Sequence, residues 1–73
     1  MISVGDLVAI REDGSGFIEG YVSREMGGEV GVVVETGTKT YVDEEMEHHT
    51  HDWAVILLDG KRVMLGVHML RPA

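Results

Sequence analysis

The chain of 73 residues has no cysteine and carries thirteen acidic against six basic residues, a formal net charge of −7. One domain of this size buries roughly 60–65% of the surface of its unfolded chain, without help from a disulfide or a zinc–thiolate site. The charge argues against nucleic-acid and anionic-lipid partners, and no apolar run approaches the roughly 20 residues that span a membrane. We therefore expect one domain over residues 1–73, cytoplasmic because no signal peptide is visible.

Short apolar stretches bounded by glycine-rich turns begin the chain. Residues 7–10 follow Gly5-Asp6 and predict a short strand, and residues 11–16 predict a polar surface loop. Residues 17–26 alternate imperfectly between apolar and polar side chains and predict a second strand. The valine-rich residues 29–35 predict a third.

The loop between the second and third predicted strands decides which face of each is buried. A three-residue loop over 26–28, with Gly28 in the left-handed region, keeps polar side chains off the valine face. In that register Val33 and Tyr21 lie opposite each other on the outer face. The buried face would then carry Val30, Val32 and Val34.

The middle of the chain changes character. Residues 38–42 are β-prone but polar, and predict either a short edge strand or the ascending arm of a long loop. Residues 43–52 hold five carboxylates, three histidines and no lysine or arginine. Because they lack an apolar period of two, they predict a long acidic, histidine-rich loop before the last hairpin. Asp43 could cap a short helical turn within it.

The last third of the chain holds the strongest local signal. Asp59-Gly60 separates two β-prone runs and favours a type I′ turn, in which both central residues have positive φ. A two-residue loop pairs Leu58 with Lys61 and, at the far end, Trp53 with Gly66. Residues 67–72 then predict a one-turn closing segment whose Met69 and Leu70 can plug the end of the fold. Alternation divides the hairpin into a face of Ala54, Ile56, Val63 and Leu65 and a face of Trp53, Val55, Leu57 and Met64.

Both faces of this hairpin are apolar, which is more apolar surface than one small domain can cover. Large exposed apolar patches usually mark interfaces, and edge strands offer a route to pairing with a second copy. We therefore predict a homo-oligomer, most simply a dimer. The expected interface consists of Trp53, Val55, Leu57, Met64, Tyr21 and Val33.

Candidate metal ligands gather in residues 43–52. Imidazole and carboxylate groups bind zinc, nickel or copper, and neighbouring residues of an extended chain point to opposite faces. His49 and His51 can therefore share a face that His48 does not. The predicted divalent-metal site consists of His49, His51 and Asp52. A solvated loop without metal is one alternative, and a pH-responsive loop is another, because histidine titrates near about pH 6.5.

Patterns of catalytic residues and of cofactor binding are missing from the sequence. There is no cysteine nucleophile, no nucleophile elbow around any serine, no P-loop and no dinucleotide fingerprint. A domain this small also rarely encloses a substrate pocket. We therefore expect a non-catalytic protein without a cofactor, apart from a possible divalent metal in the histidine loop.

The order of these features resembles that of SH3-like small barrels, in particular KOW-like proteins of bacteria and bacteriophages. The resemblance rests on Val4-Gly5-Asp6-Leu7-Val8, on Gly31-Val32-Val33-Val34-Glu35, and on the hairpin from Trp53 to Val67 closed by His68-Met69-Leu70-Arg71-Pro72. It implies an all-β barrel of about five antiparallel strands. Members act as adaptors or as ribosome- or transcription-associated modules, and many have no known role. Because RNA-binding members are usually basic, a self-associating protein-interaction or structural module is the first expectation, and nucleic-acid association is an alternative.

Overall fold

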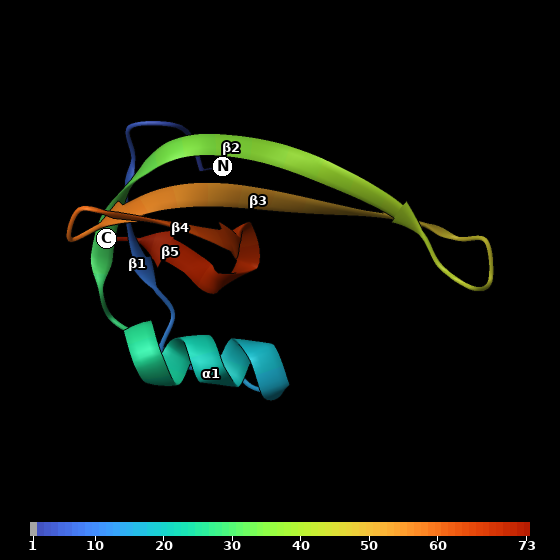
Figure 1. Cartoon of the computed structure of the whole chain (residues 1–73), viewed down its shortest axis with the longest axis horizontal. Coiled ribbons are helices and arrows are strands. Elements are labelled where there is room, and N and C mark those ends of the chain that lie inside the picture. The colour runs from blue at the N-terminus through green and yellow to red at the C-terminus, as the bar shows by residue number, and fades with distance from the viewer. Residues whose placement is uncertain (1) are drawn as a thin grey trace.

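The computed structural model describes residues 2–73. Its five strands pair antiparallel in one sheet with the order β4-β3-β2-β1-β5, and one short helix lies beside the sheet (Figure 1). The prediction of about five antiparallel strands is confirmed, whereas backbone pairing between the described residues does not close the sheet into a barrel. The elements in chain order are β1 (Leu7–Ile10), α1 (Phe17–Met26), β2 (Val30–Val42), β3 (His48–Leu58), β4 (Lys61–Gly66), the 3₁₀ turn η1 (Val67–Met69) and β5 (Leu70–Pro72).

The β3–β4 hairpin forms in the predicted register. Asp59 and Gly60 have φ of 48° and 80°, as a type I′ turn requires. Leu58 pairs with Lys61, and the pairing continues to Trp53 and Gly66 at the far end. The local turn chemistry is therefore enough to align two strands of the sheet.

The hydrophobic core lies against one face of the curved sheet. Met69 and Leu70 of the closing segment are buried in it, as predicted, and Val22 enters it from helix α1. Among the described residues, no helix has the length and apolar character to cross a bilayer. The remaining buried members of the core are Val8, Ile10, Val33, Ala54, Ile56 and Leu58.

Residues 17–26 form helix α1 and not the predicted strand. Ile18, Val22 and Met26 recur every four residues, a spacing that places them along one side of a helix. Val22 is buried and Met26 packs against the core. Gly28 has the expected positive φ of 85°, but it follows the end of a helix and not a hairpin loop.

The helix also changes which face of β2 is buried. Because no strand forms at 17–26, β2 pairs with β1 on one side and β3 on the other. Val33 pairs with Ile56 and is 1% exposed, so the prediction that Val33 faces outward is wrong. Val30, expected in the core, is 55% exposed, and Tyr21 is exposed on α1.

Strands β2 and β3 extend beyond the body as a two-stranded arm, here defined as residues 38–52 (Figure 1). Residues 38–42 and 48–52 pair with each other, and neither segment pairs with another strand. The predicted long loop over 43–52 is therefore wrong, because its second half is strand and the turn covers only residues 43–47. The radius of gyration is 12.9 Å, against about 11 Å for a compact domain of this length.

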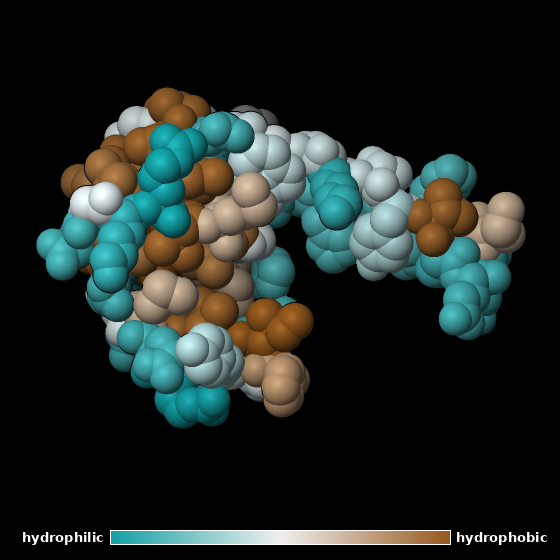
Figure 2. All heavy atoms as spheres, in the orientation of Figure 1, coloured by the Kyte–Doolittle hydropathy of each residue, from teal (hydrophilic) through white to brown (hydrophobic). Residues whose placement is uncertain are grey.

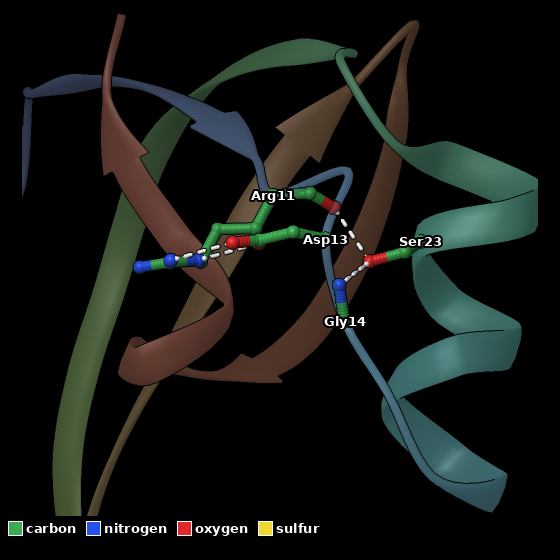
Figure 3. A network of polar contacts seen from close by, with 4 residues as sticks. All are labelled: Arg11, Asp13, Gly14 and Ser23. Carbon is green, nitrogen blue, oxygen red and sulfur yellow. Dashed lines mark hydrogen bonds and ion pairs between the residues drawn. The ribbon is translucent and has the colours of Figure 1, made fainter.

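A serine hydroxyl fixes helix α1 to the loop that precedes it (Figure 3). Ser23 Oγ accepts a hydrogen bond from the backbone N–H of Gly14 at 2.8 Å and donates one to the carbonyl oxygen of Arg11 at 2.7 Å. In the same loop, Arg11 donates from Nε and Nη2 to the two carboxylate oxygens of Asp13, both at 3.0 Å. The Ser23 contacts hold the helix in the orientation that buries its neighbour Val22.

Replacing Ser23 with alanine should lower the free energy of unfolding by about 1–2 kcal/mol, because the partly buried N–H of Gly14 loses its acceptor. Chemical denaturation followed by circular dichroism measures this change. Ser15→Ala is the control, since Ser15 is exposed and should change the stability by less than about 0.5 kcal/mol. Equal effects of the two substitutions would contradict the anchoring role of Ser23.

Candidate functional site

The two faces of the arm carry different chemistry. We call the face opposite the core the outer face and the other the inner face. On the inner face, Thr38 Oγ1 donates to Asp52 Oδ1 at 3.0 Å, and the hydroxyls of Thr40 and Thr50 lie 3.4 Å apart. Strand register and alternation give the outer face Gly37, Lys39 and Tyr41 from β2 and His49, His51 and Trp53 from β3.

A β-bulge in β2 determines which residues of the arm lie on the inner face and which lie on the outer face. Val33 pairs with Ile56 and Glu35 with Val55, so Val34 is the extra residue. The bulge reverses the order in which residues of β2 point inward and outward. Odd-numbered residues of β2 therefore face the core before the bulge and face outward after it, which places Tyr41 on the outer face.

Three rings stack across the outer face of the arm. Tyr41 stacks with two histidines, its ring centroid 5.1 Å from that of His49 and 5.3 Å from that of His51. The rings are inclined by only 18° and 10°, and His51 Nε2 lies 3.3 Å from the hydroxyl oxygen of Tyr41. The prediction that His49 and His51 share a face is consistent with this stack. The three rings therefore form one stacked aromatic cluster on the outer face.

Asp43 organises the turn at the tip of the arm. Its Oδ1 accepts hydrogen bonds from the backbone N–H groups of Glu45 at 2.8 Å and Glu47 at 3.0 Å. Its Oδ2 lies 2.6 Å from His49 Nε2. The hydrogen bond to His49, and then those from the backbone of Glu47 and Glu45, hold the pKa of Asp43 below its ordinary value.

The tip brings together a different metal-ligand set from the predicted one. One ligand atom each from Asp43, Glu47 and His49 lies within 4.8 Å of the others. His51 stacks with Tyr41 and Asp52 bonds Thr38 on the inner face, so the structure does not bring the predicted set of His49, His51 and Asp52 together. Sequence reasoning missed Asp43 and Glu47 because it placed them in a loop of undefined shape.

The predicted interface residues are divided between surface and interior. Met64 is 63% exposed, Leu57 is also exposed and Trp53 is half-buried, all on the outer face. Val55 shares that face but is only 6% exposed, so it offers little surface to a partner. Val55 therefore lies on the predicted face but is almost fully buried, whereas Val33 belongs to the core.

The base of the arm carries an open groove on the outer face. The indole of Trp53 lies over Gly37, where any Cβ atom would collide with the ring. The adjacent groove has a volume of about 490 Å³ and is lined by apolar Trp53, Met64 and Leu65 together with Lys39, His51 and Asp52. Figure 2 shows that strongly hydrophobic residues gather over the body and reappear at the far end of the arm.

No protein-family model, curated protein or solved structure matches the chain.

The low pKa of Asp43 predicts how the turn responds to acid. A depressed pKa stabilises the folded turn above the ordinary aspartate value of about 3.9, and this stability is lost as the pH falls through the lower, folded value. The amide resonances of Glu45 and Glu47 should therefore shift in NMR spectra with a midpoint below pH 3.9. Glu44→Gln should leave the midpoint unchanged, and Asp43→Asn should remove the transition. A midpoint at or above pH 4 in the unaltered protein would contradict the assignment.

Proposed function

We propose that the protein is a non-catalytic interaction module that self-associates through the outer face of β2, β3 and β4. The observation that supports this proposal is the exposed, two-stranded arm. A two-stranded ribbon on its own is marginally stable in water because it buries little surface. Every side chain of the arm's strands is exposed except that of His49, which is half-buried. A partner that covers the arm would bury side chains that no other part of the chain covers.

The exposed area supports an interface of ordinary size. The accessible surface of the chain is 5227 Å². A globular monomer of 8.0 kDa exposes about 4,450 Å². The excess of about 800 Å² is similar to the area that one partner buries in a standard protein–protein interface. The apolar Trp53, Leu57 and Met64 lie on the same face as the ring stack of the arm.

We further propose that the body is a small barrel of the SH3-like, KOW-like type. The strand order supports this, because β1 lies between β2 and β5 and brings the two ends of the chain together. The turn η1 also supports it, since it carries the chain from one edge strand to the other over the same core. Adaptor roles of such modules agree with an interaction function, and the net charge of −7 disfavours the nucleic-acid alternative.

Met64→Lys should weaken self-association at least about tenfold, a change of about 1.4 kcal/mol, because it places a charge in the apolar interface. Sedimentation velocity over a range of micromolar concentrations measures the dissociation constant. Leu7→Lys is the matched control, because Leu7 on β1 is also 63% exposed but lies outside the proposed interface. A monomeric unaltered protein at high micromolar concentration would remove the proposed function.

A metal-responsive tip is a second candidate function. The observation that favours it is the convergence of Asp43, Glu47 and His49, since one imidazole and two carboxylates suit zinc or a similar divalent ion. Three protein ligands leave positions open for water or for a group from a partner. Metal binding would then stiffen the turn and modulate association through the arm.

Titration calorimetry with zinc at pH 7 tests this candidate. His49→Ala and Asp43→Asn should each abolish the binding heat, because each removes a ligand. His48→Ala should leave it unchanged, since His48 alternates to the opposite face of β3 from His49. An equal loss of heat in His48→Ala, or no heat with the unaltered protein, would refute the metal site.

A further inference from the structure

We propose that two copies of the chain pair their arms antiparallel, outer face against outer face, with the acidic tip of each arm over Lys39 of the other. This inference rests on the proposed self-association and specifies its surface and symmetry. The resulting contact is isologous, because each copy contributes the same tip and the same base.

Charge along the arm is strongly polarised. Lys39 is the only lysine or arginine between Arg24 and Lys61, and it lies at the base in register with His51. Antiparallel pairing therefore brings Lys39 of each arm to the acidic tip of the other, with Asp52 of the base held by Thr38 on the inner face, whereas parallel pairing would set tip against tip. The acidic residues at the tip are Asp43, Glu44, Glu45 and Glu47.

The spacing along the outer face matches this symmetry. On β2, Tyr41 lies midway between Lys39 and Asp43, and on β3, His49 lies midway between Glu47 and His51. A twofold axis through this midpoint places the ring stacks of the two copies against each other. It simultaneously places Lys39 and His51 of one copy opposite the tip carboxylates of the other. Flat sheet faces of this kind stack at about 10 Å.

The apolar features agree with the same arrangement. Met46 at the tip is 77% exposed, one of the most exposed apolar side chains in the described part of the protein. Antiparallel pairing brings the tip of one copy toward the groove beside Trp53 and Met64 of the other. The inner face is a poorer surface for this contact, because Thr38 and Asp52 already satisfy each other there.

Charge reversal in two separate chains tests the proposal. Lys39→Glu should weaken the dimer at least about tenfold, because both base-to-tip contacts become repulsive. Glu47→Lys should also weaken the dimer, by a smaller factor, because the tip keeps three carboxylates opposite Lys39. An equimolar mixture of the two variants should restore association, because in the mixed dimer each reversed residue meets an opposite charge. Lys61→Glu is the matched control, since Lys61 is exposed at the β3–β4 turn outside the arm.

Sedimentation velocity separates the possible outcomes, with circular dichroism confirming that each variant is folded. A monomeric unaltered protein would overturn both the proposed function and this inference. A dimer that responds equally to Lys39→Glu and Lys61→Glu, or single variants that do not recover on mixing, would overturn the antiparallel pairing and leave self-association standing. A dimer weakened by added salt and restored by mixing supports the pairing.

Discussion

Strand β3 belongs to both the body and the arm, and its register determines which of its side chains face the core and which face outward. The turn at Asp59-Gly60 aligns β3 with β4, which directs Ile56 into the core. Because side chains alternate along a strand, the same register directs His49 and His51 outward. A slip by one residue would expose the core and turn the ring stack to the other face, so burial in the body also fixes the chemistry of the arm.

The features that could be predicted from the sequence are those with local causes. Asp59-Gly60 selects one turn type, and that turn selects the hairpin register without help from the rest of the chain. Helix α1 was missed because Phe17–Met26 carries both an imperfect alternation and a spacing of four, and only packing of Val22 into the core decides between them. The outward orientation predicted for Val33 depended on pairing with a strand at residues 17–26. Because these residues form α1, Val33 pairs with Ile56 and faces the core.

The candidate site was only partly predictable for a similar reason. Separation of His48 from His49 follows from alternation alone, and the capping tendency of Asp43 is an intrinsic property of its short carboxylate. Which carboxylates approach His49 depends on where the chain turns, however, and that turn exists because Asp43 accepts hydrogen bonds from two backbone amides. The bulge at Val34 is still less visible in sequence, although it decides which residues of β2 face outward.

The proposed pairing would couple the order of the arm to association. Cross-strand side-chain pairs contribute roughly 0.2–1 kcal/mol each. The arm is held by the stacking of Tyr41 on His49 and by the Thr40–Thr50 and Thr38–Asp52 pairs, so it is only marginally stable on its own. A second copy that binds only the ordered arm adds stability by mass action, about 2.7 kcal/mol when its concentration is 100 times the dissociation constant. The order of the arm would thus rise with protein concentration. In the proposed dimer, pairing through the arm would be lost without unfolding the core on which β3 depends, because the core residues lie outside the arm.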